Sequence, residues 1–135
     1  MNLNIITWNV RGLGRPNKRF LVKNFFDLHQ ADVCCIQESK LAYLTQSIWR
    51  EIGEGRLNSF NHIPARGSSG GIIIGWNSST RKGRVVFSGS FCLTVEFTNL
   101  VDNSVWWCTS VYGPNLSHLK QSFWDEISAF GTDHP

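Results

Sequence analysis

The residue with the clearest chemical potential is Glu38, which comes soon after a short apolar run at residues 33–36. A run that is short and apolar on both faces is typical of a central strand buried on both sides. A carboxylate at the end of such a strand is costly to desolvate unless a cation or a hydrogen-bond donor faces it. Taken alone, Glu38 is better explained as a surface carboxylate that opens a loop. Its role therefore depends on the residues that the fold brings beside it.

The four cysteines are not predicted to form a site. Cys34 and Cys35 are adjacent in the apolar run, so their side chains point to opposite faces of the strand. Cys92 and Cys108 stand apart in later strand-like runs. No pair has the spacing of zinc ligands, and the chain is apolar enough to fold without disulfides. We interpret all four as reduced core residues.

The elements that position Glu38 are predicted from the periodicity of apolar residues. The first half should contain strands at residues 3–10, 33–36 and 72–76, an edge strand at 58–64, and helices at 17–30 and 45–52. Asn17 is the expected N-cap of the first helix, along which Phe20, Leu21, Phe25 and Leu28 recur at helical spacing. A strand–helix–strand order over this distance implies that the first two strands pair in parallel.

The second half is predicted to be antiparallel, with strands at residues 85–88, 92–98 and 104–111. Leu93, Val95 and Phe97 should share one face of the middle strand, with Thr94, Glu96 and Thr98 on the other. A turn around Asp102 and Asn103 should join the last two strands. A closing helix is expected at 117–130, with the inward residues Leu119, Phe123, Trp124, Ile127 and Phe130.

Length and composition predict one folded domain: 135 residues, 41% hydrophobic and 17% charged. The mixture of predicted strands and helices assigns it to the α/β (α+β) class. The net charge of +3 is unevenly placed, because five basic residues precede the first acid, Asp27. They are Arg11, Arg15, Lys18, Arg19 and Lys23. This bias permits a polyanion partner without requiring one, since charged segments are commonly solvated faces. Neither a signal peptide nor a membrane-spanning stretch is predicted, which favours an intracellular location.

Four motifs occur in the order of one family. They are Thr7-Trp8-Asn9-Val10-Arg11-Gly12, Asp32 to Lys40 with Ile36-Gln37-Glu38-Ser39, Gly70-Gly71 with the isoleucines that follow, and Val111-Tyr112-Gly113-Pro114-Asn115. In this order and spacing the chain resembles the first half of an endonuclease/exonuclease/phosphatase domain. The branch it resembles most is the apurinic-endonuclease-like nuclease of plant LINE-type retrotransposons, which would act in the nucleus.

The resemblance implies roles for particular residues. Glu38 matches a metal-binding glutamate, and Mg²⁺ (or Mn²⁺) is the implied cofactor. Asn9 and Tyr112 match catalytic residues that support the metal and phosphate site and donate towards the scissile phosphate. Asn115 matches a polar substrate contact, and Arg11 and Lys40 are candidate phosphate contacts. Taken singly, Asn9 is better explained as a turn cap and Tyr112 as a partly buried aromatic residue. Together with Glu38, the functional interpretation is favoured.

The resemblance also implies what the sequence does not contain. The family continues with Gly-Asp-x-Asn and ends with Ser-Asp-His, which carry further catalytic residues, and no Asp-x-Asn occurs here. Asp133 and His134 follow Thr132 in a similar triplet, but too early in the chain to match. We therefore interpret residues 1–135 as a partial domain that ends before Gly-Asp-x-Asn, with a C-terminal half of the domain as an implied partner.

The predicted fold is a mixed sheet flanked by helices, the first half of an α/β/β/α sandwich. We expect one face of this sheet to lack its partner sheet and to expose an apolar patch. The implied function is Mg²⁺-dependent hydrolysis of DNA phosphodiesters, with little activity in this chain alone. Two alternatives remain open: a catalytically dead remnant that binds nucleic acid weakly, and a phosphatase of the same superfamily.

Overall fold

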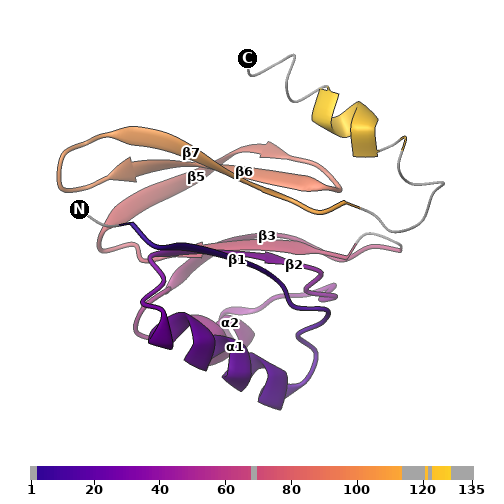
Figure 1. Ribbon diagram of the computed structural model, residues 1–135, viewed down its shortest axis with the longest axis horizontal. Helices are drawn as coiled ribbons and strands as arrows, with labels where there is room; N and C mark the ends of the chain where they lie inside the picture. The colour runs from indigo at the N-terminus through magenta and orange to yellow at the C-terminus, as the bar shows by residue number, and fades with distance from the viewer. Residues whose placement is uncertain (1–2, 68–69, 114–120, 122, 129–135) are drawn as a thin grey trace.

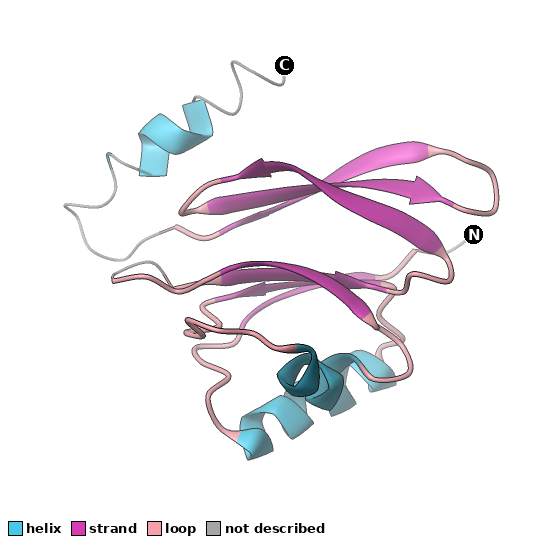
Figure 2. Cartoon of the chain, turned by 180° about the vertical axis from the view of Figure 1, so that it is seen from behind, coloured by secondary structure: helices cyan, strands magenta, loops and turns pink. Residues whose placement is uncertain are grey.

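The chain forms three layers in a computed structural model that describes residues 3–67, 70–113, 121 and 123–128. Its elements are β1 (Ile5–Asn9), α1 (Pro16–Leu28), β2 (Val33–Gln37), α2 (Gln46–Gly53), β3 (Ser59–Ile63), β4 (Ile72–Trp76), β5 (Arg81–Ser88), β6 (Cys92–Asn99) and β7 (Val105–Val111). Helices α1 and α2 cover one side of a four-stranded sheet, and a three-stranded sheet covers the other side (Figures 1 and 2). Helical backbone is also present at 121 and 123–128.

The four-stranded sheet has the order β1-β2-β4-β3, and β1 and β2 are parallel as predicted. Strand β4 runs antiparallel to both β2 and β3, so the sheet is mixed. Asn9 is paired with Gln37, which places the ends of β1 and β2 side by side. The predicted fold class, a mixed sheet flanked by helices, is therefore confirmed.

The prediction that this sheet lacks a partner is wrong. Strands β5, β6 and β7 form an antiparallel sheet that packs on the face opposite the helices. Leu93, Val95 and Phe97 of β6 meet the apolar side chains of β2 and β4 in one continuous core, which also confirms the predicted alternation along β6. The error arose because strand positions were predicted from local periodicity, whereas the packing of the sheets is a long-range property.

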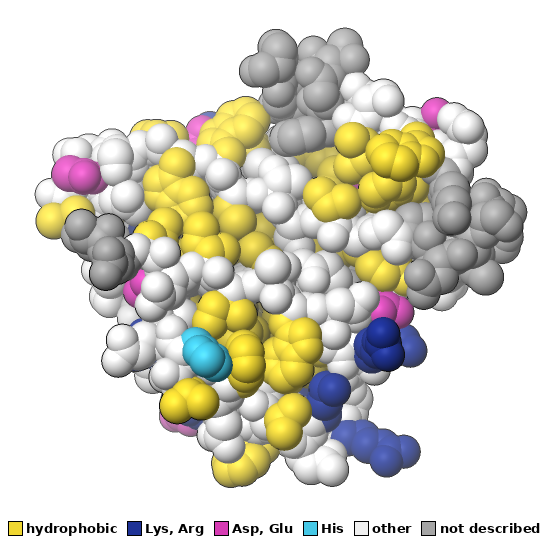
Figure 3. Space-filling view, viewed as in Figure 1, with side chains coloured by type: hydrophobic (Ala, Val, Ile, Leu, Met, Phe, Trp, Pro, Cys, Tyr) yellow, Lys and Arg dark blue, Asp and Glu magenta, His cyan; other side chains and the backbone are white. Residues whose placement is uncertain are grey.

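Apolar side chains are exposed along two sheet edges instead. Strand β1 is an edge of the first sheet, and β7 is an edge of the second. Ile5 on β1 is 45% exposed, and Val105 and Trp107 on β7 are 59% and 44% exposed. Apolar side chains gather on this side of the molecule (Figure 3). Ile5 pairs with Val33 and so shares the inter-sheet face of the first sheet, at its uncovered edge. Val105 and Trp107 are on the outer face of the second sheet, opposite its core side.

Helix α1 begins one residue earlier than predicted. Pro16 occupies the start of the helix, and Arg15 rather than Asn17 is the N-cap, without a side-chain hydrogen bond. Proline is favoured at this position because the first helical N–H groups have no intrahelical partner. The spacing of Phe20 and Leu21 indicated the helix but not its buried side, because these residues are exposed whereas Val22 and Phe26 are fully buried.

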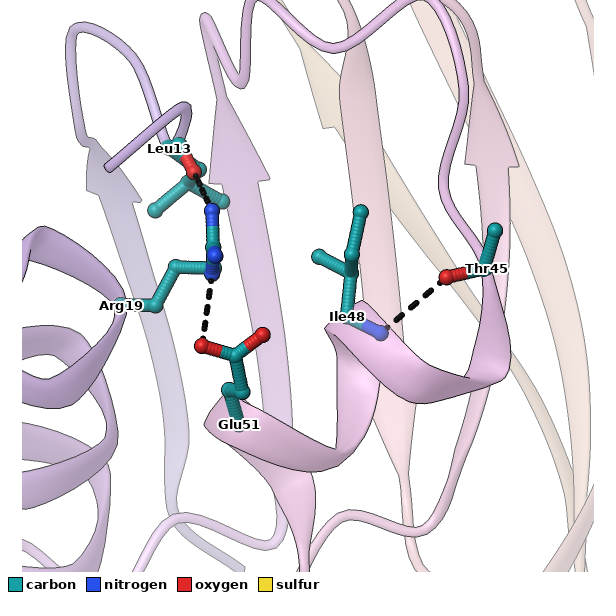
Figure 4. Close-up of polar contacts among 5 residues, drawn as sticks. All are labelled: Leu13, Arg19, Thr45, Ile48 and Glu51. Carbon is teal, nitrogen blue, oxygen red and sulfur yellow. Dashed lines mark hydrogen bonds and ion pairs between the residues drawn. The ribbon is translucent and has the colours of Figure 1, made fainter. Parts of the chain in front are cut away.

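Arg19 holds the loop after β1 against both helices (Figure 4). Its Nη1 donates to the carbonyl oxygen of Leu13 at 2.8 Å, and its Nε lies 3.1 Å from Oε1 of Glu51 on α2. Helix α2 is capped by Thr45, whose Oγ1 accepts a hydrogen bond from the backbone N–H of Ile48 at 3.1 Å. Sequence reasoning grouped Arg19 with the free basic residues, but its guanidinium is a buried structural group.

Two further predictions concern the ends of the second sheet. Asp102 and Asn103 form the predicted turn, in which Asp102 accepts a hydrogen bond from the backbone N–H of Ser104. Phe123 packs against Phe91 with ring centroids 5.6 Å apart, as an inward residue should. Trp124 was also predicted to point inward, but it is 58% exposed. No helix among the described residues is long and apolar enough to cross a membrane.

Candidate active site

The predicted site residues are carried by strand ends at one end of the sandwich. Asn9 ends β1, Glu38 directly follows β2, and Tyr112 directly follows β7 in the second sheet. The backbone N–H of Tyr112 donates to the carbonyl oxygen of Phe91, which ties the residue to the neighbouring strand. Residues from both sheets therefore converge where rigid strands give way to loops, a common position for functional side chains.

Glu38 and Tyr112 interact directly across the two sheets. Tyr112 is buried, and burial followed by the negative charge and hydrogen bonding of Glu38 raises the pKa of its phenol. Gly70 makes room for this pair, since a Cβ there would lie 3.0 Å from Cγ of Glu38 and 3.5 Å from Cε2 of Tyr112. The geometry keeps the tyrosine protonated and able to donate a hydrogen bond.

We expect Glu38→Gln to lower the pKa of Tyr112 without restoring its ordinary value, because burial is the larger cause of the shift. The measurement is a tyrosinate absorbance titration in a Tyr43→Phe background, since the sequence has only two tyrosines. The raised pKa also predicts that the folded chain loses stability as the pH rises from the unfolded value of tyrosine through the folded one. An unchanged Tyr112 titration in Glu38→Gln would show that the two side chains do not interact.

The loops that carry the site have an unusual backbone. Arg11, Glu38 and Lys40 have φ angles of 55°, 55° and 56°, in the left-handed region that non-glycine residues rarely adopt. Hydrogen bonds hold this conformation: Gly12 N–H donates to the Glu38 carbonyl oxygen, and Lys40 N–H to the Gly70 carbonyl oxygen, both at 2.7 Å. Strained backbone of this kind persists where surrounding structure supports it, and it clusters at functional sites.

Asn9 is exposed at the end of β1, where it pairs with Gln37 of β2, and its amide already has a structural role. Its Oδ1 accepts a hydrogen bond from the backbone N–H of Arg11 at 3.2 Å. Asn9 therefore caps a turn, which is the structural role that the sequence analysis gave as the alternative for this residue. An amide oxygen has two lone pairs, so this bond leaves Asn9 able to make a second contact.

A polar seam joins the two sheets beneath the site. The side-chain amide of Gln37 donates to Oγ1 of Thr7 at 2.9 Å and to Oγ of Ser110 at 2.8 Å. Gln37 and Ser110 are both buried, so these bonds also satisfy groups that would be costly to leave unpaired. Sequence reasoning missed this seam, although a glutamine at the end of an apolar strand was a signal that could have indicated it.

Four basic side chains line a cavity of about 400 Å³ next to the strand ends. Arg11, Arg15, Lys18 and Lys40 form its walls together with Gly12 and Gly14. The salt bridges among the described residues involve other cations, including Arg19 and Lys23. Lys and Arg side chains gather where β1 leads towards α1 (Figure 3). Sequence reasoning selected Arg11 and Lys40 from this group and did not assign the other two.

The metal-binding potential of the described residues is partial. No group of three or more His, Cys, Asp or Glu side chains lies close enough among them to hold an ion. Mg²⁺ is, however, often held by one or two carboxylates and completes its shell with water and phosphate oxygens. The half-buried carboxylate of Glu38 fits such an incomplete ligand set, and Asn9 ends the strand paired with the one that Glu38 follows. When bound, the ion would neutralise phosphate charge.

The remaining predicted site residue, Asn115, is outside the described residues. So are Asp133 and His134, which the sequence analysis did not assign to the site. A second cavity, of about 440 Å³, is found at the opposite end of β2 and is lined by Asp32 and Arg81 among others. It contains none of the predicted site residues, so its size does not make it the functional site.

The chain belongs to the endonuclease/exonuclease/phosphatase family, because the model of that family matches residues 6–126. AP endonuclease LMAP from Leishmania major has a similar structure, with 23% identity and a TM-score of 0.64 over 96% of this chain and 46% of that protein. A functionally unknown conserved protein from Enterococcus faecalis V583 is also similar, with 17% identity and a TM-score of 0.60 over 96% of this chain and 60% of that one. A search of curated proteins gave no match.

These likenesses define the fold and its extent. At such identities they show that the chain has the arrangement of an AP-endonuclease-like domain. The chain spans about half the length of the Leishmania protein. The two sheets with α1 and α2 therefore correspond to about half of that fold.

Proposed function

We propose that this chain forms part of a Mg²⁺-dependent (or Mn²⁺-dependent) phosphodiester hydrolase that acts on DNA. The observation that carries the proposal is the position of the Glu38–Tyr112 pair next to the basic cavity. Lys40 lines the cavity and follows Glu38 by two residues, so one phosphodiester strand can reach both. The rest of the catalytic set belongs to the half of the domain that residues 1–135 do not span.

Each side chain has a distinct task in this proposal. Glu38 holds the metal ion, and Asn9 supports the metal and phosphate site with its amide. Tyr112 is protonated at physiological pH, as an ordinary tyrosine is, and it donates a hydrogen bond towards a phosphate oxygen. Its raised pKa extends the protonated state to higher pH. Donors that are fixed before the reaction stabilise developing charge without a reorganisation cost. Asn115 is proposed to contact the substrate further along.

The basic cavity would bind the phosphate backbone next to the scissile bond. Arg11 and Lys40 were predicted as phosphate contacts, and the cavity adds Arg15 and Lys18 to them. Such contacts are independent of base sequence and give affinity that falls steeply with salt. The motif order further supports an origin in a plant LINE-type retrotransposon, whose nuclease would act on nuclear DNA.

The experiment is a measurement of DNA affinity against salt concentration in the presence of EDTA, which separates binding from catalysis. We expect Arg15→Ala with Lys18→Ala to lower the slope of log K against log salt by about 2, or about one for each phosphate contact removed. The matched control is Arg50→Ala with Lys82→Ala, which removes the same charge from residues outside the cavity.

Three outcomes would count against the proposal. Equal slopes for the site and control variants would show that only net charge matters. If the wild-type chain showed no salt-dependent binding to DNA, a polyanion such as DNA would be excluded as its substrate. Binding of an inositol phosphate in preference to DNA would favour the phosphatase alternative.

A further inference from the structure

Two cysteines from different sheets meet beside the polar seam. Sγ of Cys35 on β2 lies 3.5 Å from Sγ of Cys108 on β7. The sequence analysis placed Cys108 apart in a later strand-like run, and 73 residues separate the two cysteines. All four cysteines are free thiols. The contact is therefore a pair of reduced thiols held within reach of one another by the packing of the two sheets.

We propose that Cys35 and Cys108 form a redox pair, whose disulfide fastens the two sheets together next to the candidate active site. A disulfide requires the sulfurs to approach to about 2.05 Å. Cys108 lies on β7, an edge strand that pairs only with β6 among the described strands, so the small movement that this needs is less restrained there than on a central strand. Cys35 lies on the central strand β2 and supplies the fixed side of the bond.

Only one member of the pair is accessible to an oxidant. Cys108 is partly exposed, whereas Cys35 is 4% exposed. The hydrogen bond from the Cys35 thiol lowers the pKa of Cys108, although burial acts against this. Burial raises the pKa of Cys34 and of Cys92 to about 12. Cys108 is thus the thiol that reacts first, because the thiolate is the nucleophile.

The oxidant we consider is a peroxide, and the reaction balances with it alone. The Cys108 thiolate attacks one peroxide oxygen, which breaks the O–O bond, gives a sulfenic acid and releases one water after protonation. The Cys35 sulfur then attacks the sulfenic sulfur, so that the S–S bond forms and the S–O bond breaks. The departing hydroxide takes the Cys35 proton and leaves as a second water. Two thiols and one hydrogen peroxide thus give one disulfide and two waters.

A Cys35–Cys108 disulfide would lie close in sequence to the residues of the candidate active site. Glu38 follows Cys35 by three residues, and Tyr112 follows Cys108 by four. The disulfide would therefore connect the two strands that carry the Glu38–Tyr112 pair, next to the hydrogen bond between Gln37 and Ser110. This consequence for activity rests on the proposed function, whereas the formation of the disulfide does not.

The test uses the whole chain, treated with hydrogen peroxide, quenched, alkylated under denaturing conditions and mapped by mass spectrometry. We expect an intramolecular peptide pair that joins Cys35 to Cys108, and a higher melting temperature for the oxidised chain that returns to the starting value on reduction. Cys108→Ser should abolish both effects. The control Cys92→Ser, which leaves the pair intact, should retain both.

Three results would overturn the proposal. One is Cys108 oxidised to sulfinic acid while Cys35 stays reduced, and another is a disulfide that joins two chains. The third is a Cys35–Cys108 bond that forms only after the chain is unfolded. Alkylation of the native chain provides a check that does not depend on variants that fold, because Cys108 should react before the other three thiols.

Discussion

Residues 1–135 alone are expected to show no Mg²⁺-dependent nicking of abasic or plasmid DNA above background. A general base is typically worth about 10²–10⁴-fold in rate. Among the described residues, Glu38 belongs to no group of three or more His, Cys, Asp or Glu side chains that could complete a catalytic set. The measurement is conversion of supercoiled plasmid to the nicked form over a range of Mg²⁺ and Mn²⁺ concentrations.

In the same assay, residues 1–135 should nick DNA once the corresponding second half of a related domain is supplied. In that combination we expect Glu38→Gln to lower the rate by about 10²–10³-fold, the usual effect of removing one preorganised electrostatic group. Glu54→Gln is the matched control, because Glu54 is an exposed glutamate beyond the end of α2. It should leave the rate unchanged.

Robust nicking by residues 1–135 alone, lost in Glu38→Ala, would contradict this prediction. It would also return Asp133 and His134 to consideration as catalytic residues, although they lie outside the described part of the chain. Activity in the combined domain that survives Glu38→Gln would instead remove Glu38 from the metal site.

The local part of the fold could be predicted because it is written in short-range patterns. The helix between β1 and β2 left few ways to connect them, and the parallel pairing of these two strands follows from that constraint. The alternation of β6 likewise identified Leu93, Val95 and Phe97 as its inner face. Chain direction is enough to decide the parallel pairing, and the two-residue period of side chains along a strand is enough to decide which residues share a face.

The parts that could not be predicted depend on contacts between distant segments. Nothing in residues 85–111 by themselves shows that β7 lies over β2, so the covered sheet face and the Cys35–Cys108 contact were both missed. The burial of Phe20 and of Arg19 was assigned wrongly for the same reason. Helical spacing fixes which residues share a face, but neighbouring elements decide which face is buried.

The candidate site lies between these two cases. Glu38 could be proposed from its position after a buried strand. The residues that act with it, such as Asn9 and Tyr112, could be proposed only from the family resemblance. The contact of Glu38 with Tyr112 spans two sheets, and the close approach of Gly70 to both depends on the conformation of the loop before β4. Arg15 and Lys18 were visible as charges, but their shared cavity depends on how the loop after β1 turns into α1.

Phe97→Ala is expected to cost about 3–5 kcal/mol in the free energy of unfolding, the usual range for removal of a buried phenylalanine. Phe97 is fully buried between the sheets, with its ring centroid 5.3 Å from that of Trp76 and 4.8 Å from that of Trp106. Typical domains are stable by about 5–15 kcal/mol, so this loss would bring the chain close to unfolding. The measurement is chemical denaturation, with the 65% exposed Phe20→Ala as the control.

The same experiment tests whether the two sheets unfold as one unit. Trp49 is buried on the helix side of the first sheet, where its Nε1 donates to the carbonyl oxygen of Leu57 at 2.6 Å. If β5, β6 and β7 are an integral layer, Phe97→Ala and Trp49→Ala should both shift a single cooperative transition to lower denaturant. A two-step unfolding curve in Phe97→Ala, in which the region around Trp49 unfolds at the same denaturant concentration as in the wild type, would show that the second sheet detaches by itself. A loss below about 1 kcal/mol would show that the interface between the sheets is not a packed core, because truncating a side chain inside one costs more than that.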